Sequence, residues 1–250
     1  MSQEHSESKA RLREQRYERE YLMREKRSED ASAFEEVFDR STLTIIYEML
    51  NRGQLSKIHG VVDAGKESRI YLGEGPRGKR IAIKIFLVTT AEFRRGRMVY
   101  IEGDPRFGRV RRDTRSLVYL WAQKEFKNLE ACRRAGISAP KPILVRGNVL
   151  LMQFIGSGRT PAPLLRRVRL SQPAKMYKTL LKIVAELYQK ARIVHGDLGE
   201  YNIMIWRGKP VIFDVSQAVS VEHPMAGVFL KRDISNINNY FENYRIKLRP

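Results

Sequence analysis

The sequence predicts an α+β fold of two lobes, with strands concentrated in the first lobe and helices in the second. The N-terminal half carries short apolar runs bounded by turn-forming residues, which are typical of strands joined in hairpins. The C-terminal part carries a long apolar stripe at helical spacing before residue 188. We therefore expect a charged extension at 1–40, helical or disordered, a β-rich lobe at 41–155 and a small helical lobe at 156–250.

The elements of the β-rich lobe follow from local patterns. Residues 69–72 and 81–84 flank a turn-rich segment and predict one hairpin, and residues 143–145 and 149–156 predict another. Between these hairpins, residues 116–135 place apolar side chains on one helical face. The preceding stretch, at about 88–114, is glycine-containing and lacks strong periodicity, so we expect a flexible basic insertion there.

Two elements are expected in the C-terminal lobe. Ser171 predicts the cap of a helix whose apolar stripe runs from Met176 to Tyr188. Residues 203–206 and 211–213 then predict a hairpin around Arg207-Gly208-Lys209-Pro210. This hairpin should bring Asp214 back beside Asn202.

The segment His195-Gly196-Asp197-Leu198-Gly199-Glu200-Tyr201-Asn202, followed by Phe213-Asp214, is the most informative chemical motif. Its two carboxylates and one amide have the spacing used in phosphoryl transfer, where the first Asp accepts a hydroxyl proton and the Asn and later Asp hold magnesium. An ordinary turn would also explain Asp and Asn near Gly. The Asp at the end of the following hairpin favours the phosphoryl-transfer interpretation.

Two further signals lie upstream, in the expected order. Residues 60–68 contain two glycines that would let the backbone approach phosphates, with Lys66 and Ser68 as polar groups. This segment is close to a P-loop motif, but a P-loop must open into a helix, and residues 69–72 predict a strand instead. Lys84 stands alone among apolar neighbours, either as a phosphate-binding lysine or as an edge-strand lysine with its head in solvent.

Glu125 interrupts the apolar stripe of the helix predicted at 116–135. A lone carboxylate on an apolar face requires a partner or must reach solvent at the edge of the stripe. We expect it to form an ion pair with Lys84, as a strand lysine and a helix glutamate do in kinases.

These motifs together resemble the RIO family of atypical serine/threonine protein kinases, and most closely its Rio-one branch in an archaeal-like form with a short C-terminus. The resemblance rests on A-G-K-E-S at Ala64 to Ser68, on H-G-D-L-G-E-Y-N at His195 to Asn202, and on F-D-V-S-Q-A-V at Phe213 to Val219. Only 36 residues follow Asp214, which leaves no room for an activation segment and a peptide-binding subdomain. The resemblance therefore implies a minimal two-lobed protein-kinase-like fold of the RIO type.

The resemblance also implies ATP as substrate, Mg²⁺ as metal with Mn²⁺ as the alternative, and a role in maturation of the small ribosomal subunit as kinase, ATPase or both. Asp197 and Asp214 would be catalytic, Asn202 and Asp214 would bind metal, and Asp214 would be able to accept phosphate. Met152 would gate the adenine pocket, with the backbone of Gln153 and Ile155 bonding the base, although the family usually has Glu where this chain has Gln153. The implied nucleotide-binding set is Ala64, Lys66, Glu67, Ser68, Lys84, Glu125, Met152, Gln153 and Ile155.

Charge supports a polyanionic partner. The formal net charge is +19, and the first thirty residues hold equal numbers of acids and bases, so the excess lies in the rest of the chain. Eight arginines lie between residues 89 and 115, and a second cluster comprises Arg159, Arg166, Arg167 and Arg169. Each cluster alone would fit a solvated basic surface; with the resemblance, we expect contact with the RNA of the pre-ribosomal small subunit.

Other classes are disfavoured or remain open. We find no apolar run that could span a bilayer and no secretory signal, so we expect a cytoplasmic protein without a membrane partner. The single Cys132 excludes an internal disulfide and predicts a structural thiol. A nucleotide-dependent RNA-binding scaffold with little catalysis, and a small-molecule phosphotransferase of kinase-like fold, remain as alternatives.

Overall fold

The computed structural model describes residues 38–87, 96–108, 113–244 and 246–248. The chain divides into two compact units, residues 1–47 and 48–250. Helix α2 (Arg40–Asn51) begins in the first unit, where the Asp39 carboxylate accepts a hydrogen bond from Thr42 N at 2.9 Å. The extension predicted at 1–40 lies almost entirely outside the described residues.

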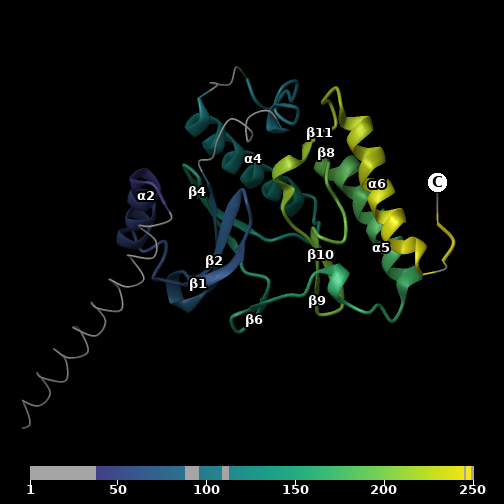
Figure 1. Ribbon diagram of the computed structural model, residues 1–250, viewed down its shortest axis with the longest axis horizontal. Coiled ribbons are helices and arrows are strands. Elements are labelled where there is room, and N and C mark those ends of the chain that lie inside the picture. Colours follow the sequence, from purple (N-terminus) through teal and green to yellow (C-terminus); the bar gives the residue numbers. More distant parts are fainter. Residues whose placement is uncertain (1–37, 88–95, 109–112, 245, 249–250) are drawn as a thin grey trace, which may run out of the picture. The chain divides into compact units, whose positions relative to one another are not determined.

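A five-stranded antiparallel sheet forms the N-terminal part of the second unit (Figure 1). Its strands are β1 (Lys57–Ala64), β2 (Ser68–Glu74), β3 (Arg80–Phe86), β4 (Pro142–Arg146) and β5 (Val149–Gln153), in the order β1-β2-β3-β5-β4. Both predicted hairpins are present, as β2–β3 and β4–β5. Strand β3 is central and almost wholly buried, as its apolar sequence requires. A short 3₁₀ turn, η1 (Pro76–Gly78), joins β2 to β3.

Helix α4 (Thr114–Arg134) connects the sheet to the rest of the unit. It begins at Asp113, whose carboxylate accepts a hydrogen bond from Ser116 N at 2.9 Å. The helix packs on β4 and β5 and also contacts the segment that follows β10, so it lies between the sheet and helices α5 and α6 in Figure 1.

The C-terminal part is mainly helical, with short strand pairs between the helices. It comprises, in chain order, β6 (Gly156–Ser157), β7 (Thr160–Pro161), η2 (Leu165–Arg167), α5 (Pro173–Glu186), η3 (Leu187–Ala191), β8 (Ile193–Val194), β9 (Ile203–Trp206), β10 (Lys209–Ile212), η4 (Val215–Gln217), β11 (Val219–Ser220) and α6 (Ala226–Glu242). Strands β9 and β10 form the predicted hairpin. Helices α5 and α6 lie side by side (Figure 1). The α+β prediction is therefore confirmed.

Two details of the predicted helix at 171–188 are wrong. Helix α5 begins at Pro173 after Gln172, and no side chain caps it, so Ser171 has no capping role. The chain leaves α-helical geometry at Leu187 and continues as a π-helical turn, which rotates the following side chains. Tyr188, predicted on the core stripe, is consequently 39% exposed.

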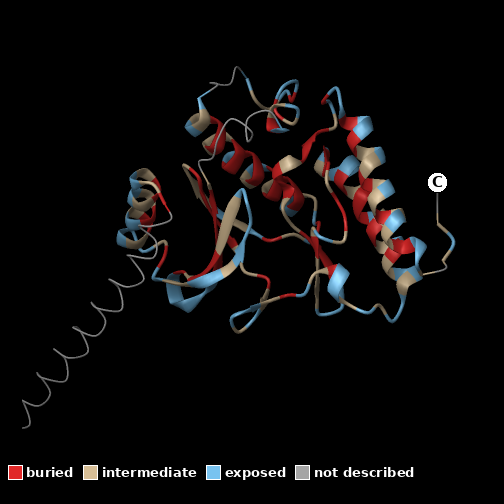
Figure 2. Cartoon of the chain, in the orientation of Figure 1, coloured by how far each residue is buried: buried red, intermediate tan, exposed pale blue. Residues whose placement is uncertain are grey.

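One apolar cluster runs from the sheet through α4 into the C-terminal helices (Figure 2). It includes Leu150 of β5, Trp121 of α4, Leu180 of α5 and Phe241 of α6. Cys132 is fully buried in the same cluster, and burial raises the pKa of its thiol to about 12, as expected of a structural thiol. Because the core is continuous, the relative position of sheet and helices is fixed by packing.

The range predicted to be a flexible insertion is described at 96–108, and there it is packed. Ile101 is buried in the core cluster, and Asp104 is 1% exposed. The Asp104 carboxylate accepts hydrogen bonds from Arg106 and from Ser220 N, and Arg106 Nη1 donates to Asn128 Oδ1 at 2.7 Å. Residues 88–95 and 109–112 of the predicted insertion lie outside the described residues.

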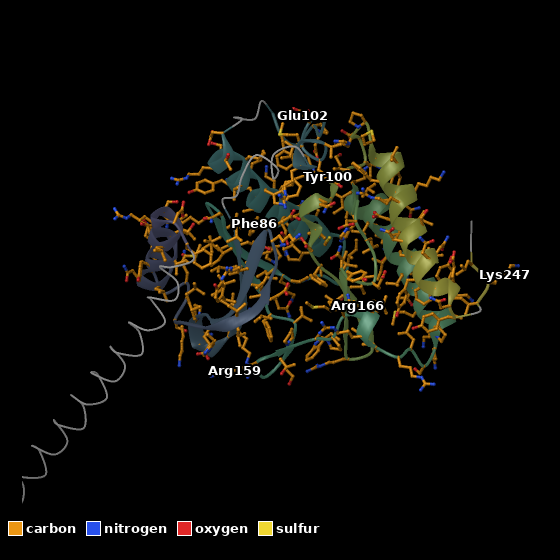
Figure 3. The ribbon with its side chains drawn as sticks, in the orientation of Figure 1. Phe86, Tyr100, Glu102, Arg159, Arg166 and Lys247 are labelled. Atoms are coloured by element: carbon orange, nitrogen blue, oxygen red, sulfur yellow. The ribbon has the colours of Figure 1, made fainter. Side chains whose placement is uncertain are left out.

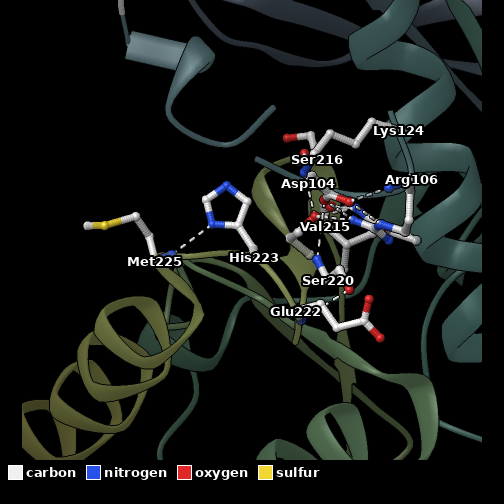
Figure 4. Close-up of polar contacts among 11 residues, drawn as sticks. Asp104, Arg106, Lys124, Val215, Ser216, Ser220, Glu222, His223 and Met225 are labelled. Atoms are coloured by element: carbon white, nitrogen blue, oxygen red, sulfur yellow. Dashed lines mark hydrogen bonds and ion pairs between the residues drawn. The ribbon is translucent and has the colours of Figure 1, made fainter. Parts of the chain in front are cut away.

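A buried polar network, drawn in Figure 4, joins this segment and α4 to the loop after β10. Lys124 Nζ donates to the carbonyl oxygens of Ser216 and Ala218, and Asn128 Nδ2 donates to those of Val215 and Ala218 at 2.7 and 2.9 Å. The Val215 carbonyl also accepts a hydrogen bond from Ala218 N within η4, and the side chains of α4 add buried donors to it and to the carbonyls of Ser216 and Ala218, so the irregular loop can be buried.

We expect Asn128→Ala to lower the free energy of unfolding by about 1–3 kcal/mol, because the carbonyls of Val215 and Ala218 lose a donor in a dry environment. Urea denaturation followed by circular dichroism measures this. Asn51→Ala, on an exposed residue, is the matched control and should change stability little. Equal midpoints for the two variants would show that the network does not support the loop.

Candidate active site

The backbone of the segment 195–202 is held by helix α6. Asp233 of α6 accepts hydrogen bonds from Gly196 N at 2.9 Å and Leu198 N at 2.8 Å, and Arg232 donates to the Gly196 carbonyl. Gly196 has φ +81°, a conformation that side-chain-bearing residues rarely adopt. His195 is buried, and its Nε2 lies 3.2 Å from the Phe213 carbonyl. Its position is that of a structural residue joining two loops.

Asp197 and Asn202 face each other across this turn. Asn202 Nδ2 donates to the Asp197 carbonyl at 2.7 Å and lies 3.3 Å from Asp197 Oδ2. Gln217 Nε2 is 3.4 Å from the same carboxylate oxygen. Burial raises the pKa of Asp197, which moves this carboxyl toward the range of a general base.

Asp214 stands after the β9–β10 hairpin, as the sequence predicted. Phe213 N donates to the Asn202 carbonyl at 3.1 Å, so the hairpin returns the chain to the turn that holds Asn202. Asp214 has φ 54° and ψ 54°, a left-handed conformation that is uncommon outside glycine and concentrated at functional sites. Its side chain is 44% exposed, and Ser216 Oγ donates to Oδ1 at 3.0 Å. One face of the carboxylate is thus held while the other is open.

Lys84 joins the two halves of the unit. Its Nζ lies 2.7 Å from Glu125 Oε2 and 2.8 Å from Asp214 Oδ1. The Lys84 and Glu125 side chains are 4% and 1% exposed, so both charges are removed from water and depend on each other. The sequence predicted the Glu125 contact but not the direct contact with Asp214.

The pKa directions follow from this geometry. Burial lowers the pKa of Lys84, but Asp214 and Glu125 outweigh that effect, so its pKa is raised and the ammonium stays charged. Burial raises the pKa of Glu125 to about 7 against the opposing effect of Lys84. Burial also acts to raise the pKa of Asp214, but Lys84 and Ser216 lower it overall. Asp214 therefore carries its negative charge at neutral pH.

The predicted phosphate loop is a turn between two strands. Gly65 N donates to the Ser68 carbonyl at 3.0 Å, and β2 begins at Ser68, so no helix follows and the P-loop alternative is excluded. Ala64, Lys66 and Glu67 are exposed on the turn, and Ser68 is half-buried. Glu67 forms an ion pair with Arg97, whose guanidinium lies 4.9 Å from the Trp121 ring. No prediction singled out Arg97.

The three residues predicted to bind adenine lie at the end of β5 and just beyond. Met152 and Ile155 are buried, and Gln153 is half-buried. Gln153 N donates to the Lys141 carbonyl, and the Ile155 carbonyl accepts from Ala162 N. These two bonds use the Gln153 N–H and the Ile155 carbonyl. Binding the edge of an adenine base would use the two other groups, the Gln153 carbonyl as acceptor and the Ile155 N–H as donor.

Sequence reasoning missed several residues that shape the site. Asp233 and Arg232 position the segment 195–202, and Lys124 and Asn128 hold the loop after Asp214. Lys124 is fully buried, and burial lowers its pKa. It is adjacent to Glu125 in the sequence, so two charged residues, not one, interrupt the apolar stripe of α4. This pair of charges was the sequence signal that could have identified Lys124 as buried.

The site's oxygen donors fit a magnesium–nucleotide complex. Among the described residues, no three His, Cys, Asp or Glu side chains are grouped to hold a metal alone. Magnesium commonly uses one or two carboxylates together with substrate phosphates and water. The Asp214 carboxylate has an open face, and the Asn202 amide donates through its nitrogen, which leaves the oxygen as a ligand.

The second basic cluster is spread over separate elements (Figure 3). Arg166 and Arg167 belong to η2, and the Arg166 guanidinium lies 4.7 Å from the Tyr201 ring. Arg159 lies on the turn between β6 and β7.

Within the described residues, no helix is long and apolar enough to cross a bilayer.

Comparison with known proteins identifies the family. A model of the RIO domain matches residues 69–249. RIO-type serine/threonine-protein kinase Rio1 of Haloferax volcanii is 38% identical over 222 residues, which cover 89% of this chain and 76% of the relative. Serine/threonine-protein kinase RIO1 of Homo sapiens is 37% identical over 229 residues, 90% of this chain but 40% of that protein.

A crystal structure of the Rio2 kinase from Chaetomium thermophilum is similar over 82% of this chain and 63% of that chain, with 26% identity and a TM-score of 0.66. Its ADP/Mg²⁺-phosphoaspartate complex gives a TM-score of 0.65 at 24% identity, over 82% and 61% of the two chains. The fold is therefore the kinase-like α+β fold of these proteins. The chain belongs to the RIO family of atypical serine/threonine-protein kinases.

Proposed function

We propose that this chain transfers the γ-phosphoryl group of ATP at a site formed by Lys84, Asp197, Asn202 and Asp214. The observation that carries the proposal is the position of Lys84 Nζ, within 2.8 Å of both Glu125 and Asp214. A buried cation beside an open carboxylate is suited to phosphate oxygens, and Glu125 orients it. The turn at 64–68 would cover the phosphates through Ala64, Lys66, Glu67 and Ser68, and Met152, Gln153 and Ile155 would hold the base.

Magnesium would be bound by Asn202 and Asp214 and would neutralise charge on the phosphates when present; the donor set does not discriminate strongly against manganese. The chain's own residues perform the remaining tasks. Asp197 accepts the proton of the attacking hydroxyl, or of water in ATP hydrolysis, while Lys84 stabilises the charge that develops on the transferred group.

Asp214 is also proposed to accept phosphate. The similar Rio2 structure is an ADP/Mg²⁺-phosphoaspartate complex. In this chain, an Asp214 carboxylate oxygen would attack the γ-phosphorus, the bond to the β–γ bridging oxygen would break, and ADP would leave. Water would then hydrolyse the acyl phosphate. The left-handed backbone and the hydrogen bond from Ser216 hold the carboxylate for this attack.

We further propose a cytoplasmic role in maturation of the small ribosomal subunit, with RNA contact through the arginine clusters. The support is the family and the net charge of +19. Part of the first cluster has another use, because Arg97 pairs with Glu67 and Arg106 with Asp104. The cluster of Arg159, Arg166, Arg167 and Arg169 is the better candidate for RNA contact.

Asp197→Asn should lower the rate of phosphoryl transfer by about 10²- to 10⁴-fold, because the amide cannot accept the proton. Steady-state ATP hydrolysis and phosphate transfer to protein substrates measure this effect. Glu222→Gln removes one exposed carboxylate elsewhere and is the control. An Asp197→Asn rate within threefold of the native rate would remove Asp197 from the chemistry.

The pH dependence of kcat/KM for ATP should follow the ionisation of Glu125. Its pKa of about 7 means that the carboxyl is protonated below that pH and pairs with Lys84 as a carboxylate above it. We therefore expect kcat/KM for ATP to rise between about pH 6 and pH 8. Glu125→Gln should be less active and lack this rise, whereas Glu130→Gln on the same helix should keep it. A rise that persists in Glu125→Gln would assign it to another group.

Incubation with γ-labelled ATP should leave label on the chain that hydroxylamine releases, because an acyl phosphate is labile to this nucleophile. Asp214→Asn should abolish that label, and Asp197→Asn, which keeps the accepting carboxylate, should still form it. Label that resists hydroxylamine and survives in Asp214→Asn would instead indicate a phosphorylated hydroxyl.

A further inference from the structure

A cavity of about 710 Å³ opens beside Asp197, away from the Lys84 ion pairs. It is lined by residues of the turn 197–202, by residues of helix α6 and of the segment directly after it, and by Arg166 of η2. Turn and helix are in direct contact, since Asp233 of α6 accepts a hydrogen bond from Leu198 N at 2.8 Å. Asp197 and Asn202 of the proposed phosphoryl-transfer site therefore also line this cavity, whereas Lys84, Glu125 and Asp214 do not belong to its lining.

The α6 wall is lined by carboxamides. Asn236 and Asn239 of α6 and Asn243, the residue directly after its end, follow one another at intervals of three and four residues, the spacing that places side chains on one helical face. Asn236 is half-buried, and Asn239 and Asn243 are exposed. Each carboxamide offers both a donor and an acceptor, so the row can bind the N–H and C=O groups of an extended polypeptide.

The charge of the cavity is opposite to that of the chain. Asp197 and Glu200 contribute two carboxylates, and Arg166 contributes one guanidinium, which gives a lining of net −1 in a protein of net +19. The Arg166 guanidinium lies 4.7 Å from the Tyr201 ring, and Tyr201 is itself 56% exposed. An acidic lining repels the phosphates of RNA and favours a neutral or basic ligand.

We propose that this cavity binds the phosphoacceptor as a polypeptide segment, with its hydroxyl at Asp197 and a basic side chain at Glu200. The inference rests on the proposed phosphoryl transfer and adds the acceptor's chemistry to it. The asparagines of α6 bind the main chain of the segment, and Glu200 selects a lysine or arginine close to the acceptor serine or threonine. Helix α6 thus supplies recognition that ordinary kinases obtain from a larger subdomain.

Transfer to the bound segment is a single displacement at the γ-phosphorus of ATP. The acceptor hydroxyl oxygen forms a bond to the γ-phosphorus, the bond between that phosphorus and the β–γ bridging oxygen breaks, and ADP leaves. The hydroxyl proton passes to the Asp197 carboxylate. No redox partner or further co-reactant is required.

The test uses three twelve-residue peptides that each contain one serine and differ at one neighbouring position, which is arginine, glutamine or glutamate. Phosphorylation kinetics at saturating ATP give kcat/KM, and fluorescence anisotropy of labelled peptides gives binding without turnover. We expect the arginine peptide to exceed the glutamine peptide by about three- to tenfold and the glutamate peptide to be weakest.

Glu200→Gln should reduce the preference for arginine over glutamine to within about twofold, while the control Glu222→Gln keeps it. Asn236→Leu and Asn239→Leu should weaken binding of all three peptides by about three- to tenfold without changing their order. The Glu200 variant would thus change which peptide is preferred, and the asparagine variants would change how tightly every peptide binds. If α6 were only structural, its variants would not separate these two effects.

Two results would overturn the inference: equal kcat/KM and equal binding of the three peptides by the native chain, or an unchanged arginine preference in Glu200→Gln. Displacement of the bound peptide by a twelve-nucleotide RNA that binds Glu200→Gln more tightly than the native chain would assign the cavity to RNA. ATP hydrolysis without peptide is measured in parallel. Its presence leaves the proposed phosphoryl transfer intact, and its absence together with no peptide phosphorylation removes both.

Discussion

The structure depends on one buried ammonium group. Lys84 on the central strand reaches Glu125, 41 residues away on α4, and Asp214, 130 residues away after the β9–β10 hairpin. An isolated charge so removed from water would be strongly destabilising, so the pairing fixes strand, helix and loop relative to one another. The same arrangement leaves Asp214 with one open face. The group that joins the halves of the unit is thus the group best placed to meet phosphate oxygens.

The loop that carries Asp214 is irregular and is buried at little cost because α4 satisfies its backbone. Lys124 and Asn128, which lie within one helical turn of Glu125, donate to the carbonyls of Ser216, Val215 and Ala218. Helix α6 does the equivalent for the segment 195–202 through Asp233. Both loops therefore hold their positions through side chains of neighbouring helices, which keeps Asp197 and Asp214 in register without a regular sheet beneath them.

Local patterns predicted much of this architecture. Alternating runs located the β2–β3, β4–β5 and β9–β10 hairpins, and a charge on an apolar stripe located Glu125. The errors have a physical basis. The π-helical turn at Leu187 exposes Tyr188, and the spacing of apolar residues along the sequence does not predict such a turn. Asp233 and Asn128 were missed because they bond to backbone atoms of distant loops, which no local pattern predicts, and Lys124 was missed because it was not considered together with Glu125 as a charged pair on one apolar face. The packing of residues 96–108 was missed because Asp104 and Arg106 look like ordinary surface charges.

Charge is distributed unevenly over the chain, and this distribution distinguishes the surface proposed to bind RNA from the cavity proposed to bind a polypeptide. A net charge of +19 favours a polyanion over most of the surface, and steering of this kind raises association rates. Yet the cavity beside Asp197 is lined by more carboxylates than cations, so a polyanion drawn to the surface is disfavoured at the point of transfer. A basic polypeptide has the opposite preference. Surface charge would then hold the kinase on RNA while the acidic cavity accepts basic protein segments bound to that RNA.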